Sequence, residues 1–173
     1  ATWSGKPDPM IRLRKAFMTL LLIVVLLPLA VIAAGQLGLL KGTAPNNLGL
    51  RDGRLKPPSK TPNSVTSQAG LWADHPMAAR AGIAPLRYTG DGPAAMKKLA
   101  EVLRGLERTV IVTEKPDYLY AQCTTALLKF TDDVEFALDT GAGVIHVRSA
   151  SRIGHGDRGV NRARVEDIRK KAG

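Results

Sequence analysis

The sequence has few of the residues that form metal centres, disulfides and base-stacking surfaces. It contains one cysteine, Cys123, and three histidines among 173 residues. A single cysteine excludes a disulfide within the chain. The paired His and Cys spacings of zinc sites are missing, so we expect no metal and no other cofactor. Aromatic residues make up 5% of the chain. No basic stripe is interleaved with rings on which bases could stack, and we therefore expect no nucleic-acid partner.

Acidic residues are scarce relative to basic ones. The chain has 25 lysines and arginines but 15 aspartates and glutamates, which gives a formal charge of +10. Residues 41–173 keep +7 of this charge, because the first 40 residues hold four of the bases and one of the acids. Beside a membrane, such an excess indicates contact with anionic lipid headgroups or with an acidic protein surface.

A long apolar run occupies the N-terminal quarter. Residues 16–40 contain no charged side chain. As a helix they would extend ~37 Å, more than the ~30 Å of a hydrocarbon core. A cleaved signal peptide is the alternative, because small residues before Ala34 suit cleavage. The run is longer than is usual in signal peptides, so we expect a single-pass transmembrane helix with the lipid bilayer as a partner. Pro28 is tolerated in such a helix and would kink it.

The charges around this run bear on its orientation. Basic residues flank it on both sides, so their local count does not settle the direction. A short basic segment before a first helix favours a cytoplasmic N-terminus, and large domains are translocated largely regardless of charge. We therefore expect the protein in the bacterial inner (cytoplasmic) membrane, with its N-terminus in the cytoplasm and its C-terminal domain in the periplasm.

Composition divides the chain into four segments: a basic tail at 1–15, the transmembrane helix at 16–40, an extended Pro/Gly-rich connector at 41–67 and an α+β domain at 68–173. The connector breaks both helical and strand periods. It is either a flexible stalk or an irregular arm that lies on the domain. The second possibility is suggested by apolar residues at intervals, namely Leu48, Leu50, Leu55 and Val65.

Within the domain, residues 90–107 predict an amphipathic helix, with Asp91 or Gly92 as the cap and Pro93 in the first turn. Ile83, Leu86 and Tyr88 indicate an earlier strand. The main strand candidates are 108–114, 117–128, 134–139 and 144–151, and a last helix is expected at 161–172. Short dividers indicate hairpins. The expected fold is α+β: a single N-terminal transmembrane helix, then an antiparallel meander of about four strands packed with two helices.

The last predicted hairpin places polar side chains together. Across its turn, opposite residues have numbers that sum to 283, so Glu135 faces Arg148 on the polar side. Asp133 and Glu135 share this side by alternation, and we expect Asp132 to join them from the preceding turn. The face is either a ligand-binding or catalytic cleft, or an ion-pair network that ties the last helix to the sheet. The candidate residues are Asp132, Asp133, Glu135, Arg148, Ser149, Arg152, His155, Asp157, Arg158, Asn161 and Arg162.

No catalytic template fits these residues, so none is assigned a catalytic role. The G-x-G-x-x-G pattern formed by Gly154, Gly156 and Gly159 follows a strand and precedes a helix, as in dinucleotide-binding folds. That fold needs parallel strands and a second strand that ends in an acid. Here the preceding strand belongs to a hairpin and one helix follows. We expect a turn whose nearby arginines meet carboxylates; an anion held by those arginines is the alternative.

Three stretches resemble a known family. They are the connector "NNLGLRDGRLKPPSKTPNSVTSQA", the strand "FTDDVEF" and the C-terminal "IHVRSASRIGHGDRGVNRARVEDIR". Together they are similar to domain-of-unknown-function family 1499 over about residues 46–171. Members are often membrane-anchored or exported, and commonly have a cysteine where this chain has Ser64. The resemblance implies no reaction. It implies a family signature made of Asp132, Asp133, Glu135, Arg148, Ser149, Arg152, Gly154, Asp157, Gly159, Asn161 and Arg162.

These observations favour a single-pass, membrane-anchored accessory or scaffolding subunit that acts by protein–protein contacts. Its partners would be other subunits of a membrane complex, such as a respiratory or photosynthetic one, contacted through residues 1–67. Gly35 and Gly38 would let the helix pack closely against a neighbour. The alternative is a membrane-tethered enzyme or small-ligand binder that uses the Asp/Glu/Arg face.

Overall fold

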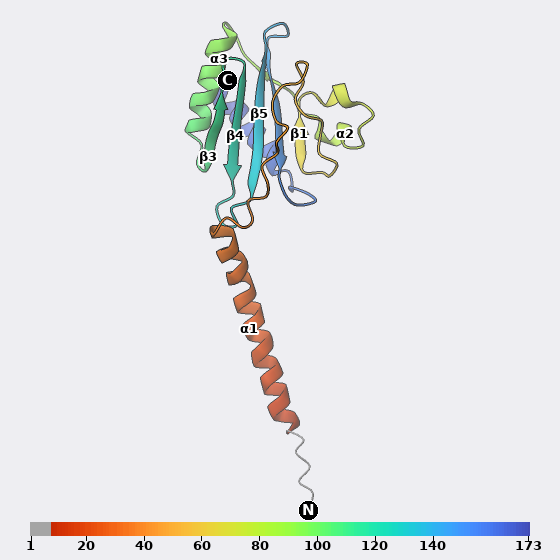
Figure 1. The fold of residues 1–173 in the computed structure, drawn as a ribbon, viewed down its shortest axis with the longest axis vertical. Coiled ribbons are helices and arrows are strands. Elements are labelled where there is room, and N and C mark those ends of the chain that lie inside the picture. Colours follow the sequence, from red (N-terminus) through yellow and green to blue (C-terminus); the bar gives the residue numbers. More distant parts are fainter. Residues whose placement is uncertain (1–7) are drawn as a thin grey trace, which may run out of the picture.

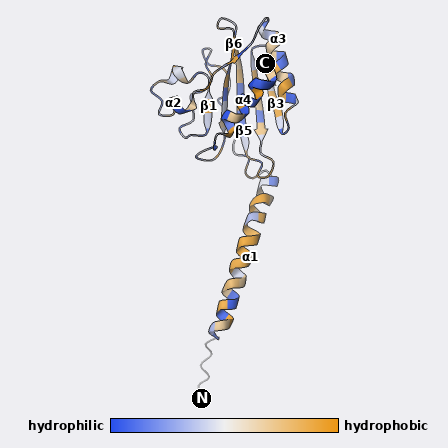
Figure 2. Ribbon diagram, turned by 180° about the vertical axis from the view of Figure 1, so that it is seen from behind, coloured by the Kyte–Doolittle hydropathy of each residue, from blue (hydrophilic) through white to orange (hydrophobic). Residues whose placement is uncertain are grey.

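The computed structural model describes residues 8–173, in which a long helix stands apart from a folded α+β domain (Figure 1). Residues 1–7 of the expected basic tail lie outside the described residues. The helix, α1, spans Pro9–Gln36. By length and composition it is able to cross a membrane, and apolar residues line most of it (Figure 2).

Helix α1 begins and ends earlier than the apolar run. It begins at Pro9 because the Asp8 carboxylate caps it, accepting the Met10 N–H at 2.8 Å, and proline suits a first turn. It ends at Gln36, and Gly38 follows in a turn with a φ of 80°. Gly35 lies where the last turn of α1 meets the domain: a Cβ there would lie 2.6 Å from the Leu128 carbonyl oxygen.

One antiparallel sheet forms the centre of the domain. Its strands among residues 8–173 are β1 (Ser64–Thr66), β2 (Leu86–Arg87), β3 (Thr109–Glu114), β4 (Tyr118–Thr124), β5 (Thr131–Asp139) and β6 (Val144–Ser151). Their order is β1-β6-β5-β4-β3, and β2 pairs with the other end of β6. The α+β prediction is confirmed, with six strands rather than about four. The additional β1 and β2 are too short to show a sequence period and depend on pairing with β6.

Two helices cover one face of the sheet. Helix α3 (Gly92–Arg104) is capped by Asp91, as its sequence predicts, and α4 (Val160–Ala172) closes the chain. They pack on alternate residues of the strands, among them Phe136 and Val147, which face each other in the predicted register. Shorter helical turns, Ala69–Trp72 (η1) and Ala78–Ala81 (α2), lie between β1 and β2.

The arm, which we define as residues 41–63, covers the opposite face. Leu55 is fully buried there with Tyr118 and Tyr120, and Leu48 and Leu50 pack beside them. In Figure 1 the arm runs from the end of α1 across the front of the sheet. Of the two possibilities for the connector, the structure therefore has the arm that lies on the domain.

Strand β5 starts earlier than predicted. Residues 131–133, expected as a turn, are paired with β4, and Asp132 and Asp133 are also paired with β6. The reversal lies instead at residues 125–130, where Lys129 has a φ of 56°, so the strand predicted at 117–128 ends at Thr124. Polar sequence indicated a turn, but each acid here has an arginine partner that makes its burial in the strand acceptable.

Candidate functional site

The two adjacent acids of β5 lie on opposite faces of the sheet. Because neighbouring strand residues alternate, Asp133 faces the arm and Asp132 faces α4. The prediction that both join one polar face is therefore wrong for Asp132. The polar residues form two clusters, one under the arm and one under α4.

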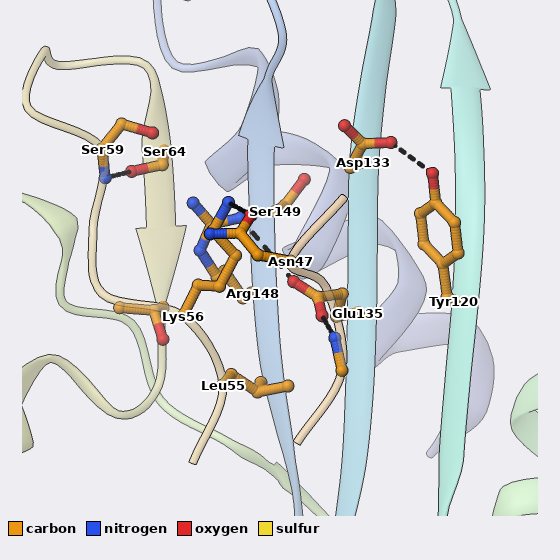
Figure 3. Close-up of polar contacts among 12 residues, drawn as sticks. Asn47, Leu55, Lys56, Ser59, Ser64, Tyr120, Asp133, Glu135, Arg148 and Ser149 are labelled. Carbon is orange, nitrogen blue, oxygen red and sulfur yellow. Dashed lines mark hydrogen bonds and ion pairs between the residues drawn. The ribbon is translucent and has the colours of Figure 1, made fainter. Parts of the chain in front are cut away.

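Glu135 is at the centre of the cluster under the arm (Figure 3). Its Oε1 accepts hydrogen bonds from the Tyr118 hydroxyl and from the Gly49 N–H of the arm, each at 2.8 Å. Its Oε2 lies 3.7 Å from Arg148 Nη1 and accepts no hydrogen bond. Arg148 in turn donates from Nε to the Pro57 carbonyl of the arm at 3.2 Å. The pair expected from the hairpin register thus also fastens the arm to the sheet.

Asp133 forms the second half of this cluster. Arg152 donates to it from Nε and Nη2, with the shortest contact at 2.8 Å. The Tyr120 hydroxyl donates to Asp133 Oδ1 at 2.6 Å (Figure 3). Gln122 Nε2 donates to that same hydroxyl. A forked guanidinium–carboxylate contact of this kind fixes orientation as well as charge.

The cluster under the arm is closed to solvent. The side chains of Asp133, Glu135, Arg148 and Arg152 are 2%, 0%, 5% and 6% exposed. Burial lowers the pKa of Arg148, against the opposing effect of Glu135. Burial raises the pKa of Tyr118, and the charge of Glu135 adds to this. At neutral pH Arg148 is positively charged and Tyr118 is uncharged, because arginine and tyrosine normally titrate far above 7.

Lys56 of the arm lies near the same charges. Its Nζ donates to Asn47 Oδ1 at 2.5 Å. Burial lowers its pKa, and the charge of Arg148 lowers it further. The arm therefore adds a third cation to the cluster, beside Arg148 and Arg152.

The second cluster joins the sheet to α4. Asp132 is paired with Arg164. Buried Asn161 accepts from the Ser149 hydroxyl at 2.5 Å and donates to the Asn63 carbonyl at 3.1 Å. These contacts tie together α4, β6 and the last residue of the arm, so they support a structural role.

The loop at residues 152–159 contains the glycine pattern. Burial opposes ionisation of Asp157, but hydrogen bonds from the N–H groups of Asn161 and Gly159 lower its pKa below the usual range. His155 and Arg158 are exposed. Arg162 donates to the carbonyls of Arg80 and Gly82. The loop is an ordinary strand-to-helix turn within an antiparallel sheet, without the parallel strands of a dinucleotide fold.

The geometry offers little for catalysis. No side chain of the arm-side cluster is both reactive and open to solvent, and residues 8–173 contain no group of three His, Cys, Asp or Glu placed to hold a metal ion. Sequence reasoning missed Tyr118 and Tyr120 as partners of the acids. Their i, i+2 spacing puts them on one strand face, but the irregular 125–130 reversal left the pairing of β4 with β5 undetermined.

Comparison with known proteins agrees with the resemblance in the sequence. The model of the family "Protein of unknown function (DUF1499)" matches residues 54–171, well over half of the chain. The match begins in the arm and includes both polar clusters. Neither curated proteins nor solved structures gave a match. The chain therefore belongs to the DUF1499 family, whose function is unknown.

Proposed function

We propose that this protein is a single-pass, membrane-anchored accessory or scaffolding subunit of a larger membrane protein complex, acting by protein–protein contacts. In this proposal α1 crosses the bacterial inner membrane, the N-terminus is cytoplasmic and the folded domain is periplasmic. Other subunits are contacted through the N-terminal part of the chain, from the tail to the arm.

The observation on which the proposal depends is the contrast between α1 and the domain. The most apolar 18-residue stretch of α1 has a mean hydropathy of 2.9 and is 0% buried against the rest of the chain. An apolar surface of this size needs lipid or other helices around it. In the domain, by contrast, the buried acids of the two clusters, Asp132, Asp133 and Glu135, are paired with arginines of the same chain. The unsatisfied surface therefore belongs to the anchor.

One observation favours the alternative of a ligand-binding or catalytic domain. Glu135 Oε2 is buried and accepts no hydrogen bond, and an orphaned buried oxygen is a common mark of a polar site. Access to it would require the arm to lift, which breaks the contacts of Gly49 and Pro57 with the sheet. We therefore favour the structural interpretation of this cluster.

The proposal is tested by native electrophoresis of membranes dissolved in mild detergent. We expect the full chain to migrate in a band much larger than the monomer. A variant in which residues 16–34 are exchanged for an unrelated apolar sequence of equal length should lose that band and remain in the membrane. Glu135→Gln is the matched control, since it alters the buried cluster and should leave the band unchanged. Migration of the native chain alone would count against the proposal.

A further inference from the structure

The end of the domain beside α1 is held against the last turn of that helix. Gln36 Nε2 donates to the Leu127 carbonyl at 2.8 Å. Gly35 packs on the Leu128 backbone so closely that a Cβ would overlap it. The 125–130 loop is therefore fixed at the level where α1 ends (Figure 1).

A second loop lies at the same end. A Cβ on Gly42, just after α1, would lie 2.8 Å from Arg152 Cβ and from Ile153 Cγ2. The loop at residues 152–158, which holds most of the glycine pattern, therefore borders the chain as it leaves the helix. We call the surface formed by residues 37–42, 125–130 and 152–158 the rim.

The length of α1 places the rim at a membrane surface. The rise from Lys15 to Gln36 is about 31 Å at 1.5 Å per residue, which matches a hydrocarbon core of ~30 Å. With Lys15 in one headgroup layer, Gln36 and the loop bonded to it lie in the other. This step depends on the proposed function in one respect, which is that α1 crosses a bilayer.

The rim combines exposed apolar side chains with cations. Leu37, Leu39 and Leu127 are 78%, 73% and 56% exposed. Lys41 precedes Gly42, and Lys129 follows the residue on which Gly35 packs. Neither lysine takes part in an ion pair within residues 8–173.

The nearby acids do not neutralise these cations. Glu107, on the loop before β3, is paired with Arg108. Asp157 accepts the backbone N–H groups of Gly159 and of Asn161, the second residue of α4. Arg158 is exposed and has no ion pair in the described part of the chain. It lines a hollow of about 260 Å³ between the two loops, together with Phe130 and Ile153 and with the acids Asp132 and Asp157. Asp132 is already paired with Arg164.

We propose that the rim binds the headgroups of anionic phospholipids in the leaflet where α1 ends, through Lys41, Lys129 and Arg158. Leucines at headgroup depth beside unpaired cations are the composition of a surface that lies on a bilayer. An acidic protein would not account for the exposed leucines at that depth. The glycine-containing turn thereby serves to bring Arg158 and Ile153 to the lipid.

The experiment uses the full chain in nanodiscs, with Cys123→Ser and an NBD fluorophore on Leu127→Cys. Phosphatidylglycerol or phosphatidylcholine with a spin-labelled headgroup is added as quencher in equal amounts. We expect the anionic lipid to quench at least ~5-fold more effectively at low salt, the factor that about 1 kcal/mol for one cation at an anionic surface gives. High salt should reduce this preference.

Two controls separate the rim from general charge and from tethering. The triple variant Lys41→Gln, Lys129→Gln, Arg158→Gln should lose the preference. A variant with the same charge loss at exposed sites elsewhere, Arg87→Gln, Lys97→Gln, Lys115→Gln, should keep it. NBD on Ala142→Cys, in the β5–β6 turn at the far end, should not be quenched.

Each other outcome contradicts a different statement. Equal quenching of Leu127 by both lipids would overturn headgroup recognition and leave the membrane anchor intact. Weak quenching by both would also overturn it, because the rim would then stand away from the bilayer. A label on Leu26→Cys reports on insertion itself. If quenchers deep in the acyl chains fail to reach that label, the proposed membrane anchor fails and the rim with it.

Discussion

The contact between the last turn of α1 and the domain can be tested by adding one methyl group, at Gly35. In Gly35→Ala the added Cβ would lie 2.6 Å from the Leu128 carbonyl oxygen and 2.8 Å from its Cα, and these backbone atoms have no rotamer by which to move aside. Overpacking of this kind costs about 1–3 kcal/mol. The Gln36 hydrogen bonds that hold this contact contribute about 0.5–1.5 kcal/mol each. The cost of the added methyl group is comparable to the whole stabilisation from the Gln36 hydrogen bonds. We therefore expect the contact between the end of α1 and the 125–130 loop to be lost.

The same substitution should leave the rest of the chain intact. Alanine is a better helix former than glycine by about 1 kcal/mol, so α1 itself is not weakened. The angle between α1 and the domain is followed in nanodiscs with spin labels on Leu26→Cys in the helix and Glu107→Cys in the domain, in a Cys123→Ser background. The distribution of distances between the two labels reports how firmly this angle is held. Gly35→Ala should broaden it, whereas Ala33→Leu, at an exposed site two residues earlier, should not. An unchanged distribution in Gly35→Ala would refute the reasoning.

Three further outcomes follow from the buried groups. Glu135→Leu leaves Arg148 buried without its carboxylate and should cost about 3–5 kcal/mol in urea unfolding, most of it recovered in Glu135→Leu/Arg148→Met; a single-variant loss below about 1 kcal/mol would contradict this. Because the folded pKa of Asp157 is lowered, its stabilisation is complete above the ordinary value of about 3.9 and is lost as the pH falls through the folded pKa. In Asp157→Asn the melting temperature should therefore fall less steeply at acid pH than in the native protein. Parallel curves of melting temperature against pH for the two proteins would contradict this. Burial raises the pKa of the Cys123 thiol, so a maleimide should react slowly with the native protein and rapidly in denaturant, with equal rates as the contrary result.

The fold was predictable where local chemistry determines it. Asp91 and Pro93 mark the start of α3, and the turn before Val144 fixes the register in which Glu135 faces Arg148. The short β1 was not predictable, because three residues give no period and its pairing with β6 is a contact between segments far apart in the sequence.

The candidate site was predictable only within one hairpin. Alternation along β5 correctly places Asp133 and Glu135 on one face. Placing Asp132 required knowing that the strand begins before it. Its position depends on Arg164, a residue of α4 whose approach is set by the packing of that helix. The hydrogen bond from the Gly49 N–H to Glu135 could not be predicted either, because it depends on the irregular course of the arm across the sheet.

The adjacent acids of β5 have a consequence for how this family can vary. Asp132 is paired with Arg164 on one face of the sheet, and Asp133 is paired with Arg152 on the other. Deleting or inserting one residue just after them would exchange their sides and leave each opposite the wrong environment. Strand length here should accordingly be constant among relatives. Substitutions should instead occur in pairs, position 132 changing with 164 and position 133 with 152, as two independent sets.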